Sequence, residues 1–251
     1  MTNIIFWDYD GTIANTEIVY KKATEEYLRK QNELLLDIPN EYFFKNISGH
    51  RPEEFLPKLI EDGFINSKIE PEALRQYYGV YFNELQKGTV KITEKIDLVI
   101  EKLSQKKDLI MCITSSSLKD TFMLKHTNVN NKILNKTFNI EENIYLCGCI
   151  KDCKFKPYPD IFLHALADII KKYNLNINKN TNIIVVEDST AGCQAGHSFK
   201  LEKNNEANIT VIGYLGGTLI DNTKELLKNG ADIVAKNYEE LYTRIDSIFS
   251  K

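Results

Sequence analysis

The chain has 251 residues, of which 43% are hydrophobic, and a formal net charge of −3 from 32 basic and 35 acidic side chains. This balance argues against nucleic acid as the main partner, because affinity for a phosphate backbone comes from clustered Lys and Arg. No apolar run approaches the roughly 18–20 residues that cross a bilayer, and the first residues lack the basic and apolar regions of a signal peptide. We therefore expect a soluble, cytoplasmic protein with no membrane partner.

Short apolar runs rich in β-branched residues alternate with helical patterns along most of the chain. The runs predict strands buried on both faces and lie at residues 3–7, 108–113, 143–148, 182–187, 208–215 and 232–235. The helical patterns lie at residues 94–105, 117–126, 159–173, 190–199, 222–229 and 238–249. Because strands that alternate with helices form βαβ units, we expect an α/β fold with a mostly parallel sheet covered on both faces. The Asn-rich segments 128–143 and 174–182 are interpreted as polar loops.

The alternation is interrupted after the first strand. Residues 17–90 contain helical patterns and no convincing strand, and Pro52 and Pro71 are well placed to begin helices. An insertion of this length far exceeds the roughly 2–6 residues of a normal βα connection. It predicts two domains, a core formed by residues 1–15 and 91–251 and a small helical domain formed by residues 16–90 over the strand ends.

The five cysteines suit a reducing compartment rather than a disulfide scaffold. Cys147, Cys149 and Cys153 lie close together, but their spacing is not a usual zinc pattern and no histidine lies nearby to complete one. Buried or loop thiols are the better interpretation.

In a parallel sheet, ligands bind beyond the carboxyl ends of the strands, so the residues that follow each apolar run are candidates for a site. They form four groups far apart in sequence: Asp8 and Asp10; Thr114, Ser115 and Ser116; Lys156 and Pro157; Glu187, Asp188 and Ser189. The predicted topology brings all four groups to one edge of the sheet.

Each group also has a simpler local interpretation. Asp-Tyr-Asp-Gly is an ordinary turn sequence, and the serines of "TSSS" and "EDSTAG" could only cap the helices that follow them. "KPYPDIF" could be a loop stiffened by proline. The case for a functional site depends on all four groups occurring together and in order.

At this point the sequence resembles a known family. "DYDGT", "TSS", "KPYPDIF" and "VVEDSTAG" are similar to the four motifs of the haloacid dehalogenase-like hydrolase superfamily. The insertion resembles the helical cap of the branch that contains β-phosphoglucomutase and small sugar-phosphate phosphatases. The resemblance covers nearly the whole chain and implies a Rossmann-like core with a helical cap.

The resemblance also implies phosphoryl transfer through an aspartyl-phosphate. Asp8 would be the nucleophile, which suits a carboxylate because it is ionised near neutrality and needs no base. Asp10 would protonate the leaving oxygen and then activate water. Lys156 would supply positive charge, and Thr114 with the backbone N–H of Ser115 would bind the phosphoryl oxygens.

The same resemblance implies Mg²⁺ as the cofactor. Its ligands would be a carboxylate oxygen of Asp8, the backbone carbonyl of Asp10 and Asp188, which are the hard oxygen donors that Mg²⁺ prefers. Glu187 would support the ligands from behind, for example by orienting metal-bound water, and Ser189 is placed with it in this supporting set.

Within the family, Asp10 speaks against the dehalogenases, which usually lack this second aspartate. A β-phosphoglucomutase-like mutase is the closer alternative. Tyr20 stands where the mutase has a histidine that assists the acid, and Thr12 is typical of phosphatases, so both positions favour a phosphatase. Asn15 replaces an aspartate that many relatives have and puts the support of the cap hinge in question.

Substrate selection is expected to come from the cap. "ISGHRPEEF", residues 47–55, resembles a cap loop that faces the active site, so His50 and Arg51 are candidate substrate-binding residues. They could equally be linker residues before the helix that begins at Pro52.

Taken together, the sequence predicts a monomeric, Mg²⁺-dependent phosphatase for small phosphorylated metabolites, with sugar or sugar-acid phosphates as the first choice. A phosphosugar mutase, a receiver-like phosphorelay protein and a non-catalytic phosphate-binding protein on the same fold remain alternatives. The length of the chain and its helical insertion count against the receiver, which is about half as long.

Overall fold

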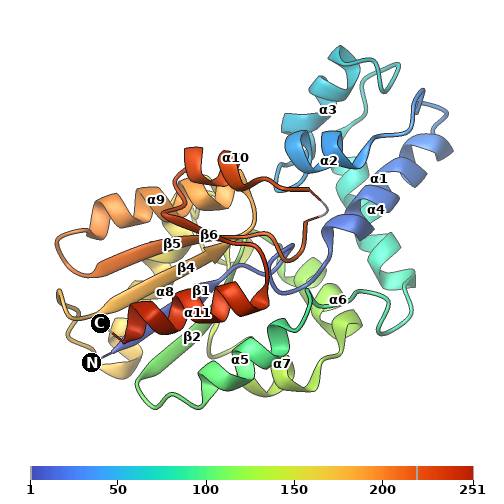
Figure 1. Ribbon diagram of the computed structural model, residues 1–251. Coiled ribbons are helices and arrows are strands. Elements are labelled where there is room, and N and C mark those ends of the chain that lie inside the picture. The colour runs from blue at the N-terminus through green and yellow to red at the C-terminus, as the bar shows by residue number, and fades with distance from the viewer. Residues whose placement is uncertain (1, 219, 251) are drawn as a thin grey trace.

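The fold is built on a six-stranded sheet of parallel strands in the order β3-β2-β1-β4-β5-β6 (Figure 1). The computed structural model describes residues 2–218 and 220–250. The strands are β1 (Asn3–Trp7), β2 (Leu109–Ser115), β3 (Ile144–Leu146), β4 (Asn182–Glu187), β5 (Asn208–Tyr214) and β6 (Ile233–Ala235). The predicted parallel sheet and its six strands are therefore confirmed.

Helices cover the sheet and form a separate group beyond the carboxyl ends of its strands (Figure 1). They are α1 (Glu17–Lys30), α2 (Asn40–Asn46), α3 (Pro52–Glu61), α4 (Pro71–Glu84), α5 (Ile96–Ser104), α6 (Lys119–Val129), α7 (Lys132–Thr137), α8 (Asp160–Tyr173), α9 (Thr190–Lys203), α10 (Thr223–Lys228) and α11 (Tyr238–Phe249). Pro52 and Pro71 occupy the first turns of α3 and α4 as expected, because proline lacks only an N–H that a helix start leaves unpaired.

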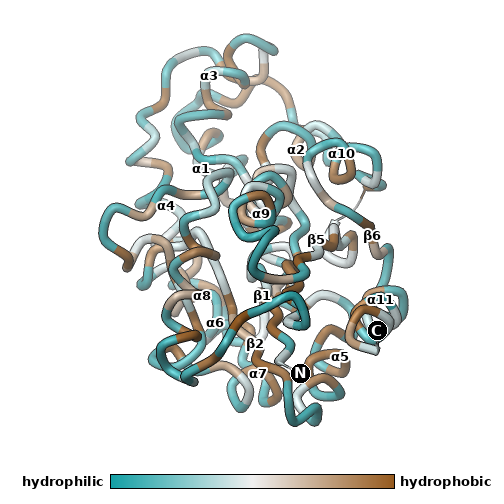
Figure 2. The backbone as a smooth tube through the Cα atoms, turned by 90° about the vertical axis from the view of Figure 1, so that its left-hand side faces the viewer, coloured by the Kyte–Doolittle hydropathy of each residue, from teal (hydrophilic) through white to brown (hydrophobic). Residues whose placement is uncertain are grey.

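Successive strand residues point to opposite faces of the sheet, and each face has its own hydrophobic cluster. Ile5 and Trp7 of β1 pack with α5, α6, α7 and α11, whereas Ile4 and Phe6 pack with α8 and α9 on the other side. Hydrophobic residues are correspondingly frequent along the strands in the middle of the molecule (Figure 2). The sheet is thus buried on both faces, which explains why its strands are continuous apolar runs.

Helices α1 to α4 share a third hydrophobic cluster of their own, which includes Leu28, Phe43, Leu59 and Leu74. The chain enters and leaves this helical group along two adjacent linkers. Ala14 pairs with Ile92 in an isolated bridge, and the backbone N–H of Asn15 donates to the Lys91 carbonyl at 2.7 Å. The boundaries of the cap domain at residues 16 and 90 stay a prediction.

Helix α6 joins the sheet to the second linker. Asn128 on α6 is buried, and its side chain accepts a hydrogen bond from the Val90 N–H at 2.9 Å and donates to the Leu85 carbonyl at 3.2 Å. Helix α4 of the helical group also packs on α6. This one helix of the core therefore supports both the cap and its linker.

The interpretation of residues 128–143 as a polar loop is wrong, because α7 (Lys132–Thr137) lies within it. The side chain of Asn131 accepts hydrogen bonds from the backbone N–H groups of Ile133 and Leu134, and Leu134 is fully buried. An Asn-rich composition suggests a loop, but asparagine is also a favoured helix N-cap. One buried leucine and one cap suffice here for a short helix.

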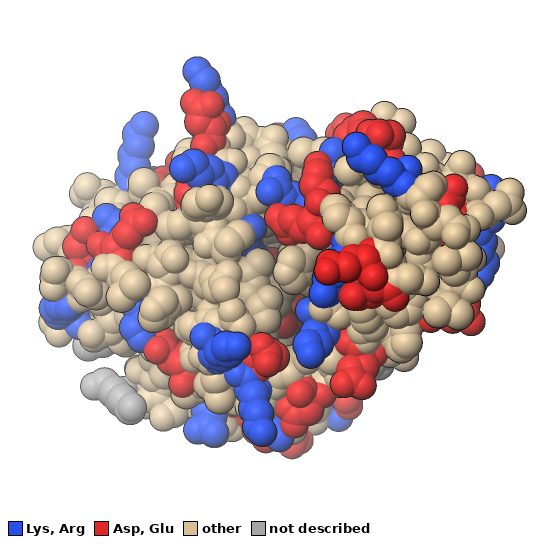
Figure 3. Space-filling model, turned by 90° about the horizontal axis from the view of Figure 1, so that it is seen from above, with Lys and Arg blue, Asp and Glu red and all other residues tan. Residues whose placement is uncertain are grey.

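Acidic and basic side chains are intermixed on the face of the molecule shown in Figure 3. Among residues 2–218 and 220–250, no helix has both the length and the apolar character that a bilayer span requires.

We expect Phe6→Ala to lower the free energy of unfolding by about 3–5 kcal/mol, because it removes a large buried side chain. Phe6 is fully buried, and its ring centroid lies 5.8 Å from that of Phe162 and 5.9 Å from that of Phe199. Urea unfolding followed by circular dichroism measures the change. Leu201→Ala on the exposed side of α9 is the control and should change stability by less than about 0.5 kcal/mol; equal effects of the two substitutions would contradict this packing.

Candidate active site

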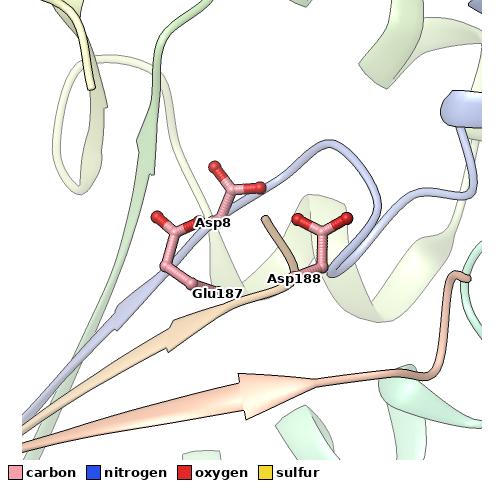
Figure 4. Close-up of side chains that lie close together, drawn as sticks. All are labelled: Asp8, Glu187 and Asp188. Carbon is pink, nitrogen blue, oxygen red and sulfur yellow. The ribbon is translucent and has the colours of Figure 1, made fainter. Parts of the chain in front are cut away.

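The site begins where β1 and β4 end side by side. Trp7 is paired with Val186 in the parallel register, so the residues that follow them, Asp8 and Glu187 with Asp188, leave the sheet together. The backbone N–H of Asp8 donates to the Val186 carbonyl at 3.0 Å and extends the pairing. Carboxylate oxygens of Asp8, Glu187 and Asp188 lie within 4.8 Å of one another, and all three residues are buried (Figure 4).

Two glycines allow the backbone to approach these carboxylates closely. A Cβ on Gly11 would lie 1.8 Å from Asp188 Oδ2, and a Cβ on Gly192 would lie 1.8 Å from Glu187 Oε2. Gly11 also has a φ of +78°, a backbone conformation that residues other than glycine rarely adopt. The glycines of the first and fourth motifs thus leave room for the Asp188 and Glu187 carboxylates.

Lys156 is the cation of this cluster. Its Nζ lies 2.6 Å from Asp8 Oδ1 and 2.6 Å from Glu187 Oε1, and it donates to the Thr114 carbonyl at 3.0 Å. Burial works against the charge on Lys156, but Asp8 and Glu187 together outweigh burial and raise the pKa of the lysine. Lys156 therefore stays protonated and holds Asp8 in place.

One lysine does not balance the carboxylates. Burial, followed by repulsion from Asp8, Glu17 and Glu187, raises the pKa of Asp188 well above its ordinary value. The pKa of Asp8 is also raised, mainly by burial and against the attraction of Lys156. The cluster has hard oxygen donors and an excess of negative charge, so its residues fit a divalent cation such as Mg²⁺.

Asp10 lies in a different environment from Asp8. Its Oδ1 accepts a hydrogen bond from Thr16 at 2.6 Å, and its Oδ2 accepts from Ser117 at 3.1 Å. Lys125 Nζ donates to Asp10 Oδ2 at 2.5 Å and to Ser117 Oγ at 2.7 Å. The two aspartates of the first motif are therefore each paired with a lysine from a different part of the chain.

The last residues of β2 and the residues that follow β4 line the same edge of the sheet. Thr114 and Ser115 are buried, and Ser115 Oγ accepts a hydrogen bond from the Ser117 N–H at 3.1 Å, while Ser116 is partly exposed. Ser189 caps α9 by accepting from the Gly192 N–H at 3.0 Å. Its interpretation as a helix cap is thus confirmed, while its role in the supporting set stays a prediction.

The cap loop lies directly against this edge. A Cβ on Gly49 would lie 2.8 Å from Ser189 Cβ, and the Arg51 guanidinium lies 5.4 Å from the centre of the Phe155 ring, one residue before Lys156. His50 Nδ1 bonds to the Ser48 carbonyl at 3.0 Å. A small pocket between cap and core is lined by Phe44, Ser48, Asp188, Ser189, Thr190, Thr218, Asn222 and Leu226. Arg51 therefore borders the core, while His50 bonds within its own loop.

The three neighbouring cysteines are not all buried, and two of them lie close together. Among the described residues, the His, Cys, Asp and Glu side chains grouped closely enough for a metal are Asp8, Glu187 and Asp188. Cys147 Sγ lies 2.7 Å from Cys153 Sγ, and Cys149 is exposed. The interpretation as buried or loop thiols agrees with this arrangement.

The sequence interpretation missed four residues around Asp10, namely Thr16, Glu17, Ser117 and Lys125. Glu17 is the first residue of α1 and looks like an acidic residue that favours a helix N-terminus, yet it is buried and faces the cluster. Lys125 follows Phe122 by three residues on the buried side of α6. That spacing alone does not distinguish it from a solvated lysine, because the sequence of α6 has no clear apolar face.

Comparison with known proteins identifies the family. Residues 4–203 match the model described as haloacid dehalogenase-like hydrolase, and the chain belongs to this family. Among curated proteins, no match was found. The motifs and the insertion had led to the same family.

Solved structures share the fold over nearly the full chain. A conserved haloacid dehalogenase-like protein of unknown function from Agrobacterium tumefaciens has a TM-score of 0.73 at 20% identity, covering 99% of each chain. A HAD family hydrolase from Deinococcus radiodurans, solved with bound phosphate and sodium, has a TM-score of 0.71 at 18% identity, covering 98% of this chain and 96% of that one. A putative β-phosphoglucomutase from Thermotoga maritima has a TM-score of 0.64 at 22% identity, covering 99% of this chain and 100% of that one.

We expect Glu17→Gln to change how stability depends on pH. Burial, with repulsion from Asp10, raises the pKa of Glu17 from 4.5 to about 7, while a hydrogen bond from Ser48 works against the shift. Because the folded protein then binds more protons between pH 4.5 and pH 7, wild-type stability should fall across this window as pH rises. A shift of this size corresponds to roughly 3 kcal/mol at most, and Glu17→Gln should remove that part of the slope.

The measurement is urea unfolding between pH 4 and pH 8 with chelator present. Glu41→Gln is the control, because Glu41 is an exposed carboxylate of α2, and it should keep the wild-type slope. Identical slopes for wild type and Glu17→Gln would show that Glu17 is not titrating as expected.

Proposed function

We propose that the protein is a Mg²⁺-dependent phosphatase for small phosphomonoesters that forms an aspartyl-phosphate on Asp8. The observation that carries the proposal is the position of Asp8, which pairs with Lys156 at 2.6 Å and lies beside the carboxylates of Glu187 and Asp188. An anionic nucleophile that attacks an anionic phosphate needs positive charge beside both groups; Lys156 supplies part of it, and a divalent cation bound by the carboxylates would supply the rest. The family supports the proposal, as does the Deinococcus hydrolase with its bound phosphate.

Asp8, Asp188 and the backbone carbonyl of Asp10 are the proposed ligands of Mg²⁺. Glu187 is fully buried, whereas Asp8 and Asp188 are 7% and 6% exposed, so we place Glu187 behind the ligands. When bound, the metal neutralises negative charge on Asp8 and on the phosphoryl group.

In the first step, an oxygen of Asp8 attacks phosphorus and the bond from phosphorus to the substrate oxygen breaks. Protonated Asp10 donates its proton to that oxygen, and the alcohol leaves. Lys156 holds Asp8 in position for the attack. Thr114 and the Ser115 N–H at the end of β2 are proposed to bind the phosphoryl oxygens of the transferring group.

In the second step, water attacks the aspartyl-phosphate and Asp10 takes up its proton. Inorganic phosphate is released, Asp8 is again a carboxylate, and Asp10 is again protonated. Each cycle therefore consumes one phosphomonoester and one water and gives one alcohol and one phosphate. The same aspartate serves as acid and then as base because it faces the leaving group and the water in turn.

Our first choice of substrate is a polyhydroxylated one such as a sugar or sugar-acid phosphate. The pocket between cap and core has a volume of about 10 Å³, room for a single water molecule, so a sugar would enter only after the cap moves; its lining includes the polar Ser48, Thr190 and Asn222 as well as the apolar Phe44 and Leu226. Such polar groups exchange hydrogen bonds with sugar hydroxyls. We propose that residues 16–90 act as a cap that covers the bound substrate and excludes water until the phosphoenzyme has formed.

Arg51 and His50 are proposed to contact the substrate from the cap loop. Arg51 is the better placed of the two, because it lies over Phe155 beside Lys156. His50 would have to release its contact with the Ser48 carbonyl.

The central experiment is a screen of the purified protein with Mg²⁺ over p-nitrophenyl phosphate and a panel of phosphorylated sugars and sugar acids. We expect phosphate release that chelator abolishes. Asp8→Asn should lower kcat by roughly 10³-fold or more, because it removes the nucleophile. Asp120→Asn, which changes an exposed aspartate on α6, is the control and should retain wild-type activity; full activity in Asp8→Asn would overturn the mechanism.

A mutase is distinguished by its products. Incubation with β-glucose 1-phosphate and glucose 1,6-bisphosphate should release inorganic phosphate if the protein is a phosphatase. Glucose 6-phosphate without free phosphate would instead favour the mutase, whose fold the Thermotoga protein shares. Tyr20, which stands where the mutase has its histidine, packs against Tyr78 and Phe82.

Mg²⁺ should stabilise the fold independently of any turnover. At a concentration about 100-fold above its dissociation constant, a bound metal contributes roughly 2.7 kcal/mol, or about 5–10 °C in Tm for a chain of this size. Asp188→Asn should lose this shift and should be more stable than wild type without metal, because it relieves the repulsion that Asp188 experiences from Asp8 and Glu187. Differential scanning fluorimetry with and without Mg²⁺ measures both effects, and an unchanged metal shift in the variant would contradict the ligand assignment.

A further inference from the structure

Lys125 is a fully buried lysine that the phosphatase mechanism described above does not use. Its side chain has no solvent exposure, whereas that of its partner Asp10 is 21% exposed. Burying an ammonium group costs several kcal/mol unless it is paired and hydrogen-bonded. The contacts that offset this cost all lie toward the active site.

Those contacts fix the Asp10 carboxylate from separate segments of the chain. Lys125 on α6 and Ser117 after β2 both donate to Oδ2, and Thr16 at the start of the cap donates to Oδ1. Ser117 also accepts from Lys125, so the lysine retains a partner at 2.7 Å when Asp10 carries a proton. Both carboxylate oxygens are thus oriented before any substrate binds.

Lys125 also contacts the cap. Its Nζ lies 5.5 Å from the centre of the Tyr20 ring on α1, within the range of a cation–π interaction. One turn further along α6, Asn128 holds the second linker through Val90 and Leu85. The same face of α6 therefore meets the aspartate, the first cap helix and the linker.

We propose that Lys125 is a positioning residue that directs the Asp10 carboxylate toward the leaving oxygen of the substrate. The inference rests on the proposed phosphatase function, in which Asp10 is the acid and base. Misplacing a catalytic group by about 1 Å costs on the order of 10²-fold in rate. Lys125 would therefore affect catalysis through Asp10 alone, and chiefly where the leaving group needs a proton.

The experiment compares kcat/KM of wild type, Lys125→Met, Asp10→Asn and the double variant on two substrates. Phenyl phosphate has a leaving group that depends on protonation, whereas p-nitrophenyl phosphate has one that leaves readily without it. We expect Lys125→Met to lower kcat/KM by roughly 10- to 100-fold on phenyl phosphate and by less than about 3-fold on p-nitrophenyl phosphate. Asp10→Asn should likewise lose more kcat/KM on phenyl phosphate than on p-nitrophenyl phosphate. Adding Lys125→Met to Asp10→Asn should lower kcat/KM by less than about 2-fold further.

Lys136→Met on α7 is the matched control, because Lys136 is an exposed lysine, and it should behave as wild type. Equal losses on both substrates in Lys125→Met, or full additivity with Asp10→Asn, would overturn the proposal and leave Lys125 a purely structural residue. If Lys125→Met folds poorly, Lys125→Arg takes its place as the test variant. Because arginine keeps the positive charge, Lys125→Arg should retain part of the wild-type activity on phenyl phosphate.

A crystal structure of Lys125→Met separates this inference from the proposed function. If wild type hydrolyses neither substrate, the phosphatase proposal fails, and the position of Asp10 still decides the role of Lys125. We expect the Asp10 carboxylate to rotate away from Ser117 in the variant. An unchanged carboxylate held by Thr16 and Ser117 alone would contradict a positioning role.

Discussion

Repulsion among buried carboxylates is the constraint around which the strand ends are arranged. Two adjacent parallel strands, β1 and β4, end in Asp8, Glu187 and Asp188, whose oxygens lie within 4.8 Å of one another. Burial and mutual repulsion raise the pKa of Asp188, so the cluster is costly to fold in its charged form. Carboxylates with pKa values raised in this way are typical of catalytic sites, where a bound cation would offset their repulsion.

The cap depends on the same edge of the sheet. Its two linkers lie side by side next to the first motif, and Thr16 at the start of the cap bonds to Asp10. Glu17 follows directly and faces the carboxylate cluster, so the first turn of α1 belongs to both the cap and the site. A movement of α1 would therefore displace groups that contact Asp10, which links the helical insertion physically to the first motif.

Much of the fold and part of the site follow from the sequence for a simple reason. Parallel strands end at one edge, so Asp8, Thr114 and Asp188 could be placed together from the expectation of a parallel sheet. Lys125 could not, because a lysine in the middle of a helix is usually solvated, and its burial depends on how α6 is rotated against Tyr9 and Tyr20. Helix α7 was missed for a related reason, since the cap formed by Asn131 becomes meaningful only once Leu134 is known to be buried.

Tyr9 explains how two aspartates so close in sequence obtain different neighbours. Its side chain is fully buried, its ring centroid lies 4.7 Å from that of Phe122, and its hydroxyl bonds to His126 Nδ1 at 3.2 Å. Successive side chains of an extended chain point to opposite sides. Tyr9 packs on α6, and Asp8, on the opposite side of the chain, pairs with Lys156. Asp10 pairs with Lys125, which lies on the same helix that holds Tyr9. The anchoring of Tyr9 on α6 therefore places the first motif next to the lysine that Asp10 contacts.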